Sequence, residues 1–244
     1  MNVTRVLKEC YEVARRHPVM FVPLLAASVF AVLFSLIVVG SAVPMLGTMA
    51  ADPNAVTPEQ FAAGVGAAAT GMFLVSVVGG IAYLLAHGMT VVMADLALKG
   101  RTPTLQAGWS GLTARLGPII LASILVGLLV GLGVLLLVVP GIILAFLLMF
   151  TLVSVIVDDT DAVDAIKRSV RAVTGHFRET FVVFLVLIAL GVLSGVVSGI
   201  LGIIPFLGAI LTMAVSAIYT GYMTLFMLRA YREITSPPGP PPAG

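Results

Sequence analysis

The chain has 244 residues, of which 60% are hydrophobic and 10% are charged, and its mean hydropathy is +1.16. Soluble domains are about 45–50% apolar and about 25% charged, so this chain has too few polar side chains to cover a soluble surface. The composition excludes a soluble enzyme, a disordered chain and a nucleic-acid binder, and it indicates an integral membrane protein in contact with the lipid bilayer. The net charge of +2 is too small to predict an acidic partner.

Four long stretches without Asp, Glu, Lys or Arg locate the membrane spans. A helix needs about 20 residues to cross ~30 Å of hydrocarbon, so the last two stretches, 116–157 and 180–228, are each long enough for two spans. Proline ends one helix and is tolerated at the start of the next, which predicts turns at Pro140-Gly141 and at Pro205. The sequence therefore predicts an all-α polytopic membrane protein with six transmembrane helices in three hairpins, at about 18–40, 68–94, 118–138, 141–157, 180–203 and 206–228.

The basic residues predict the orientation of these spans. All 13 Lys and Arg residues fall on one side, whereas the other side, residues 41–67 and the two proline turns, carries only Asp52 and Glu59. Because cytoplasmic loops are enriched in Lys and Arg, we expect a multi-pass protein of the cell (plasma) membrane with both termini in the cytoplasm. The basic N-terminus followed by a long apolar span indicates an uncleaved anchor and not a signal peptide.

A short segment with helical periodicity precedes each hairpin on the predicted cytoplasmic side. The first covers residues 2–16, and the second follows the start signal Thr102-Pro103. The third begins at Asp161, which we expect to cap its first turn, and ends at Gly175. The predicted apolar faces are Val3, Val6, Leu7, Cys10, Val13 and Ala14; Leu105, Trp109, Leu112 and Leu116; and Val163, Ile166, Val170 and Val173.

The three hairpins have similar spacing, which favours a repeat. The intervals from the last basic residue to the outer proline, residues 16–44, 115–140 and 178–205, are nearly equal. One interpretation is a single membrane domain, residues 1–235, with three parallel repeats; the alternative is that any helical hairpin has basic flanks and a proline turn. The predicted repeats are about 2–97, 102–157 and 161–228, the first with an outer insertion at 47–66 that contains a helix start at Thr57-Pro58, and residues 236–244 are a disordered, proline-rich cytoplasmic tail.

The amphipathic segments have two possible roles. They could form a docking platform for a protein partner or for anionic lipid, for which the third segment offers Asp164, Lys167, Arg168 and Arg171. Asp164 is spaced to pair with Lys167 and Arg168. They could instead be elbow helices that complete the bundle at the headgroup level, and the single tryptophan, Trp109, fits both roles.

Few polar side chains lie within the predicted spans. His87 is the ionisable one, with Asp95 at the cytoplasmic end of the same helix. An intramembrane ionisable group is a functional candidate, but one hydrogen bond would also satisfy a buried neutral histidine. Tyr83, Ser194 and Ser198 could line a polar path with His87, or could bond their own helix and join neighbouring helices.

Regularly spaced glycines predict close helix packing in two spans. Small residues four apart let another backbone approach, either within the bundle or between two copies of the chain. The candidates are Gly191, Gly195 and Gly199 in the fifth span, and Gly127 and Gly131 in the third.

Signatures of enzymes are missing from the sequence. It has no His-Glu-x-x-His, no paired intramembrane aspartates, no Gly-x-Ser-x-Gly and no phosphate-binding glycine loop. We therefore expect a non-enzyme without catalytic, cofactor-binding or metal sites. Cys10 is the only cysteine, which excludes an intramolecular disulfide.

Two motifs carry a resemblance to a known family. Residues 15–18, Arg-Arg-His-Pro, precede a span with Pro23, and residues 161–169, Asp-Ala-Val-Asp-Ala-Ile-Lys-Arg-Ser, are followed by Gly-His-Phe at 175–177. This pattern resembles the six-helix membrane domain of glycerophosphoryl diester phosphodiesterases and the largely uncharacterised YciC-like proteins. The resemblance implies a membrane module. Catalysis in that family lies in a separate soluble domain, so no catalytic residue carries over.

Three functions remain open at this point. The leading hypothesis is a membrane scaffold or partner subunit that associates with an unidentified membrane or cytoplasmic protein through its amphipathic segments. The alternatives are a transporter or permease-like component, in which the helix at 161–174 couples to a cytoplasmic motor, and a lipid-handling membrane protein.

Overall fold

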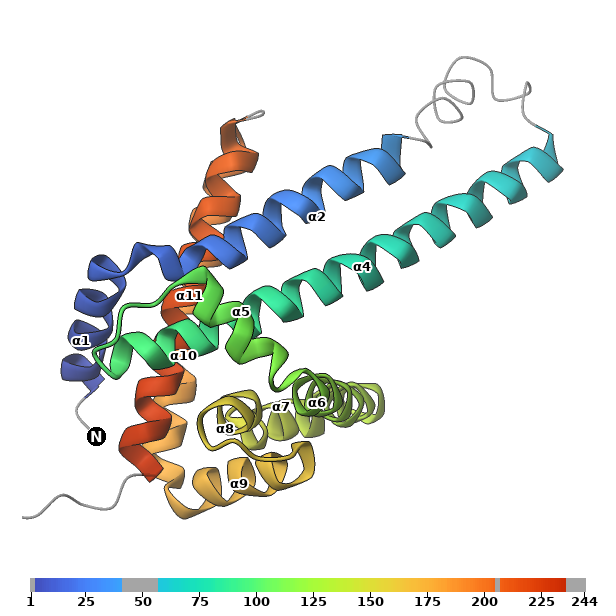
Figure 1. Ribbon diagram of the computed structural model, residues 1–244. Helices are drawn as coiled ribbons and strands as arrows, with labels where there is room; N and C mark the ends of the chain where they lie inside the picture. Colours follow the sequence, from blue (N-terminus) through green and yellow to red (C-terminus); the bar gives the residue numbers. More distant parts are fainter. Residues whose placement is uncertain (1–2, 41–56, 205–206, 236–244) are drawn as a thin grey trace, which may run out of the picture. The chain divides into compact units, whose positions relative to one another are not determined.

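A computed structural model describes residues 3–40, 57–204 and 207–235, and these residues form helices joined by short links, with no strand among them (Figure 1). The helices are α1 (Val3–Arg16), the 3-10 helix η1 (Pro18–Phe21), α2 (Val22–Gly40), α4 (Pro58–Leu98), α5 (Leu105–Thr113), α6 (Leu116–Leu136), α7 (Val138–Leu147), α8 (Thr151–Val157), α9 (Ala162–Gly175), α10 (Phe177–Leu201) and α11 (Leu207–Thr235). The predicted turn at Pro205 and the proline-rich tail lie outside the described residues.

Six of these helical segments are long and apolar enough to cross a membrane, which confirms the predicted all-α, six-span fold. They are Pro18–Val38, Pro58–Leu98, Leu116–Leu136, Val138–Val157, Phe177–Leu201 and Leu207–Thr235. The chain is therefore a multi-pass membrane protein. Helices α1, α5 and α9 precede the three hairpins, as the periodicity predicts.

The chain divides into two compact units, and the smaller one covers residues 24–86. Within it, Gly71 of α4 faces the Val38 side chain of α2. The predicted helix start at Thr57 is confirmed: the Gln60 amide donates to Thr57 Oγ1 (3.2 Å), and the Thr57 amide donates to Gln60 Oε1 (3.0 Å), a capping box. The helix that starts there continues without interruption to Leu98, and its 41 residues extend about 60 Å.

The larger unit contains residues up to 23 and those from 87 onward, and its core lies near one end of the spans. Buried side chains are concentrated in the second half of α11, in α8, at Val91–Ala94 of α4 and at Val6 and Cys10 of α1. Side chains at the opposite ends are exposed, for example Leu135 at 81%, as expected of surfaces that contact lipid tails. We call the packed end, which carries the Lys and Arg residues, the basic end.

The hairpin between the third and fourth spans turns earlier than predicted. Helix α6 ends at Leu136 and α7 begins at Val138, so Pro140 lies inside the first turn of α7 and not in the link. A first-turn proline lacks only an amide that has no helical partner. The backbones approach closely there, because a Cβ on Gly141 would lie 2.7 Å from the Val134 amide nitrogen.

The fourth span is divided into two helices. Helix α7 ends at Leu147 and α8 begins at Thr151, with Leu148–Phe150 forming a turn between them. An interruption inside a membrane span releases backbone groups that need other partners. The predicted fourth span, 141–157, is therefore present, but it consists of two helices and not one.

The amphipathic helices lie where the sequence predicts them, but some of the residues that cap them or are buried differ from the prediction. Helix α1 packs against the second half of α11 (Figure 1) and buries Val6 and Cys10, as predicted. Helix α5 begins after the predicted start signal Thr102-Pro103, and its N-cap is Thr104, whose Oγ1 accepts from the Ala107 amide (3.1 Å). Leu112 of α5 is buried, whereas Leu105 and Trp109 are about half exposed.

Helix α9 buries a face that only partly matches the predicted one: Val173 is buried as predicted and Ile166 and Val170 are half-buried. It ends at Gly175, as expected, but Asp161 at its N-cap makes no side-chain cap hydrogen bond. The buried residues are Ala162, Ala165, Ser169, Ala172 and Val173, while Val163 is 51% exposed. The prediction selected the largest apolar side chains. The structure instead buries the small ones, which let α9 lie close to α6, α7 and α8.

Gly141 and Gly131 form a matched pair for testing the α6–α7 hairpin. Gly141→Ala should lower the free energy of unfolding by about 1–3 kcal/mol, because the new methyl group meets backbone atoms that cannot move aside. Gly131→Ala should be neutral or slightly stabilising, because nothing lies within 4 Å of its Cβ and alanine favours the helix. Thermal unfolding in lipid nanodiscs measures both; equal midpoints would contradict the hairpin geometry.

Cys10 should resist thiol reagents in the folded protein. Its side chain is fully buried, and burial raises the pKa of the Cys10 thiol from 9.0 to about 12, against a smaller lowering by the Arg229 guanidinium. Only the thiolate reacts, so we expect slow maleimide labelling at pH 8 that becomes fast when the protein is unfolded in detergent. The exposed variant Glu12→Cys, in a Cys10→Ala background, should label rapidly while folded. Equal rates for the two folded proteins would show that α1 does not pack on α11.

Candidate functional site: the basic end of the bundle

The last turns of α11 join segments that are far apart in the sequence. Within the larger unit, they contact α1, the end of α4 and the loop after α8. The contacts are the ion pairs Arg229–Glu9 (2.9 Å), Arg5–Glu233 (3.0 Å) and Arg232–Asp95, and the hydrogen bond that the Tyr231 hydroxyl donates to Asp158 (2.5 Å). Lys99 also pairs with Asp95 (2.6 Å). The C-terminal end of α11 is thus the centre of the basic end.

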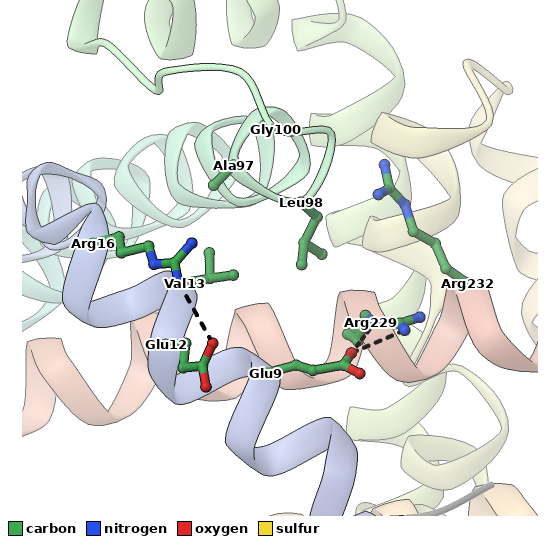
Figure 2. A pocket seen from close by; sticks show the side chains of 9 residues that line it. All are labelled: Glu9, Glu12, Val13, Arg16, Ala97, Leu98, Gly100, Arg229 and Arg232. Atoms are coloured by element: carbon green, nitrogen blue, oxygen red, sulfur yellow. Dashed lines mark hydrogen bonds and ion pairs between the residues drawn. The ribbon is translucent and has the colours of Figure 1, made fainter.

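A first polar pocket opens between α1, the end of α4 and α11. It measures about 390 Å³, and Figure 2 shows the side chains around it. Arg16, Arg229 and Arg232 line it together with Glu9 and Glu12. Arg229 is tightly paired with Glu9, whereas the Arg16–Glu12 pair is long (3.8 Å) and exposed. The pocket therefore has a mixed, largely compensated charge.

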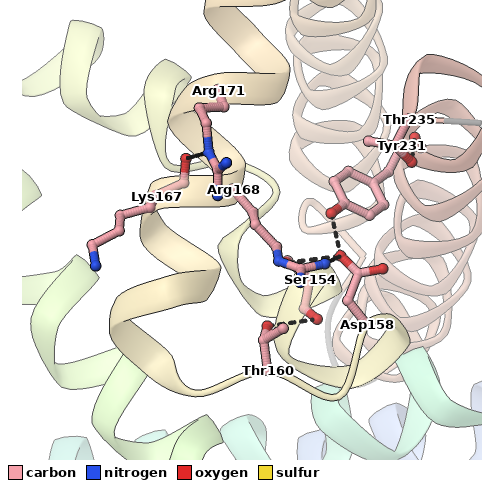
Figure 3. A network of polar contacts seen from close by, with 8 residues as sticks. All are labelled: Ser154, Asp158, Thr160, Lys167, Arg168, Arg171, Tyr231 and Thr235. Atoms are coloured by element: carbon pink, nitrogen blue, oxygen red, sulfur yellow. Dashed lines mark hydrogen bonds and ion pairs between the residues drawn. The ribbon is translucent and has the colours of Figure 1, made fainter.

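A second pocket, about 470 Å³, lies between α9 and the end of α11. Figure 3 shows Arg168 reaching toward Asp158, which also receives the Tyr231 hydroxyl. Asp158 Oδ2 further accepts from Ser154 (3.1 Å). Arg171 and His176 also line it, together with Ala172, Ile234 and Thr235, so two arginines face one carboxylate.

Ser169 fixes α9 to the interruption in the fourth span. Its hydroxyl donates to the Leu147 carbonyl (2.8 Å) and accepts from the Phe150 amide (3.2 Å). These are the backbone groups that the break between α7 and α8 releases. Because Ser169 is fully buried, α9 is part of the packed structure and not a mobile surface helix.

The predicted docking residues lie on or beside the exposed face of α9. Lys167 pairs with Asp164 (3.2 Å), as the spacing predicts, and both side chains are more than 60% exposed. Arg168 pairs with Asp158 (3.4 Å) and not with Asp164. Arg171 donates to the Lys167 carbonyl (3.4 Å), and among the described residues no carboxylate pairs with it.

The loop after α8 is also tied to the start of α6. Asp159 has a positive φ of 54°, a conformation that Asp adopts more readily than most residues. Its carboxylate accepts from the Arg115 guanidinium (2.5 Å), which lowers the pKa of Asp159. The link ties the connection between the second and third predicted repeats to the second repeat.

His87 borders a third cavity, which measures about 400 Å³. Residues of α4, α6, α7, α8 and α11 line this half-open cavity, and its other polar lining residues are Ser123 and Thr151. His87 Nε2 lies 3.2 Å from Thr224 Oγ1 of α11. Asp95 does not line this cavity, because it pairs with Arg232 and Lys99 at the basic end.

The other predicted polar residues of the larger unit lie away from the His87 cavity. Ser194 lines a separate apolar groove between α10 and α11, beside Tyr219 and Tyr222, and Ser198 lies one turn farther along α10. Tyr83 belongs to the smaller unit, where it is 49% exposed. A polar path that includes Tyr83 stays a prediction.

The predicted packing glycines are mostly open. A Cβ on Gly191 would lie 3.0 Å from Tyr219 Oη, but nothing among the described residues lies within 4 Å at Gly127, Gly131, Gly195 or Gly199. Close approaches occur instead at Gly133, at Gly141 and at Gly221, which faces the Phe21 ring. A contact between copies of the chain at the open glycines stays a prediction.

Sequence reasoning missed the partners that build the basic end. Glu9, Asp158 and Tyr231 look like ordinary flanking residues, and nothing local points to their contacts. Ser169 lies in the quoted motif at 161–169, but its role depends on a helix break that the apolar sequence conceals. In the described ranges no three His, Cys, Asp or Glu side chains gather closely enough to hold a metal ion.

The Arg232–Asp95 pair should contribute more to stability than the exposed Arg16–Glu12 pair. Arg232→Gln leaves a carboxylate that is only 12% exposed without one of its two cations, which should cost about 1–3 kcal/mol. Arg16→Gln should cost about 0–1 kcal/mol, as for other exposed pairs. Thermal unfolding in nanodiscs compares them. Adding Asp95→Asn to Arg232→Gln should recover part of the loss, whereas equal midpoints for the two single variants would contradict this role of Arg232.

Comparison with known proteins gives one match that covers nearly the whole chain. Residues 1–234 match the family described as a domain of unknown function (DUF7847). No curated protein and no solved structure matches the chain. The resemblance to glycerophosphoryl diester phosphodiesterase membrane domains is not part of this match and stays a prediction. A match across all six spans and all three amphipathic helices shows that the chain belongs to the DUF7847 family.

Proposed function

We propose that this protein is a non-enzymatic membrane scaffold whose α9 docks a cytoplasmic protein. The observation that carries the proposal is the two-sided character of α9. Its inner face is buried and bonded to the broken span through Ser169, whereas Lys167 is 63% exposed and Arg171 is exposed, its guanidinium lying along α9 at the Lys167 carbonyl (Figure 3). A charged surface on a fixed helix is preorganised, which lowers the entropic cost of binding a partner.

The orientation that this function needs is supported by the distribution of charge. Every Lys and Arg lies near the basic end or in its flanking segments, and such an excess is typical of the cytoplasmic side. We therefore assign the basic end and both termini to the cytoplasm, and the protein to the plasma membrane.

The chemistry of the α9 surface indicates an acidic partner segment. Arg171 has no carboxylate partner among the described residues, and the adjoining pocket of about 470 Å³ adds Arg168 and His176. A carboxylate of the partner could pair with Arg171 bidentately. Because this surface is exposed, salt should weaken the contact.

A transporter or lipid-handling function is the second candidate. The broken fourth span and the cavity of about 400 Å³ beside it favour this alternative, because interrupted helices often border substrate sites in transporters. Solute flux into liposomes that contain only this protein, lost in His87→Leu, would favour transport over the scaffold.

Site-specific crosslinking tests the scaffold. With a photoreactive amino acid at Lys167 in native membranes, we expect a discrete protein adduct whose yield falls about tenfold in Arg171→Glu and with rising salt. Arg16→Glu is the control, because it reverses another exposed arginine, at the other pocket, and it should leave the adduct unchanged. Adducts with lipid alone, or equal losses in both charge reversals, would overturn docking at α9.

A further inference from the structure

The cavity beside His87 lies at mid-depth in the spans. Gly127 and His87, which line it, are each eleven residues from the basic ends of α6 and α4, a distance of about 16 Å along a helix. This is roughly half of the ~30 Å hydrocarbon thickness. The volume of about 400 Å³ falls in the ~300–1,000 Å³ range of small-molecule pockets.

Thr151 places an unsatisfied hydroxyl in this cavity. Its side chain lines the cavity and is 1% exposed, and Thr151 Oγ1 has no hydrogen-bond partner. A helical threonine usually bonds the carbonyl four residues earlier. Here that carbonyl belongs to Leu147 and already accepts the Ser169 hydroxyl (2.8 Å). Thr151 is the first residue of α8, beyond the break that ends α7 at Leu147, and its hydroxyl does not bond that carbonyl. The Thr151 hydroxyl therefore lacks the usual helical acceptor, which a ligand could supply.

The remaining lining selects the kind of ligand. It is mostly apolar, with Val126, Val130, Leu148 and Leu152 among its members, and no Lys or Arg lines it. A charged headgroup would have no counter-ion at this depth, where an unpaired charge is costly. Burying a neutral hydroxyl requires one hydrogen-bond partner, which Thr151 supplies. We propose that the cavity binds one neutral long-chain alcohol from the bilayer, its hydroxyl on Thr151 and its chain against α6 and α8.

Gly127 supplies a direct way to fill the cavity. It lines the cavity, and a Cβ built on it meets nothing within 4 Å, so a larger side chain enters empty space and does not strain the bundle. Gly131, one turn farther along α6, is equally open but does not line the cavity. Gly127→Leu and Gly131→Leu are therefore the same substitution at equally open positions of α6. Only Gly127→Leu reduces the volume of the cavity.

Photolabelling of the full chain in phosphatidylcholine vesicles tests the proposal. The probe is dodecanol that carries a mid-chain diazirine and a terminal alkyne, and the comparison probe is the same chain without the hydroxyl. We expect saturable labelling by the alcohol on α6 and α8, with competition by unlabelled dodecanol. Gly127→Leu should reduce it at least tenfold, whereas Gly131→Leu should match the wild type. Thr151→Val should raise half-saturation about fivefold, the effect of one hydrogen bond.

Three results would overturn the proposal. The first is equal half-saturation for the alcohol and the hydrocarbon probe, because the hydroxyl would then make no contact. The second is wild-type labelling of Gly127→Leu, once its unfolding midpoint shows that it is folded. The third is an absence of saturable labelling, as expected if the cavity holds only water. None of these results depends on docking at α9.

Discussion

The end of α11 is the constraint on which the larger unit depends. Arg229 and Arg232 hold the carboxylates of Glu9 and Asp95, and the Tyr231 hydroxyl holds Asp158. These three acidic residues belong to the first amphipathic helix, the second span and the loop after the fourth span. A hydrophobic force cannot align helices that are already surrounded by lipid, so polar contacts must set their register. The basic end supplies them where the chain leaves the hydrocarbon.

Ion pairs of this kind have a larger effect on which arrangement of the helices forms than on the stability of that arrangement. Burying two charges costs desolvation energy that their attraction only partly offsets. Each pair of α11 is nevertheless specific, because moving α11 by one residue would turn Arg229 away from Glu9 and Arg232 away from Asp95. The exposed apolar surfaces at the far ends of α6, α7 and α10 impose no such requirement. The buried core and these ion pairs thus lie at the same end of the spans.

The features that could be predicted from the sequence are those that depend on residues close together in the chain. The six spans follow from length and apolarity, and the Thr57 capping box from a four-residue pattern. The position of the Pro140 turn was wrong because proline is accepted in a first helical turn as well as in a link. The partners at the basic end could not be predicted, because Glu9 and Arg229 are 220 residues apart and any of several carboxylates could satisfy that arginine. The docking residues Lys167 and Arg171 were visible as a charged face, but the helix break behind them was not.

Ser169 connects the two proposed sites. Its hydroxyl holds α9, which presents Lys167 and Arg171, to the Leu147 carbonyl and the Phe150 amide, next to Thr151, which lines the cavity. Removing this hydroxyl leaves that carbonyl and that amide without their side-chain partner in the turn before Thr151, so Ser169→Ala would change both sites together. Substitutions at Arg171 and Gly127 act on one site each. The docking face and the cavity are therefore physically linked through one side chain, yet they can be tested separately.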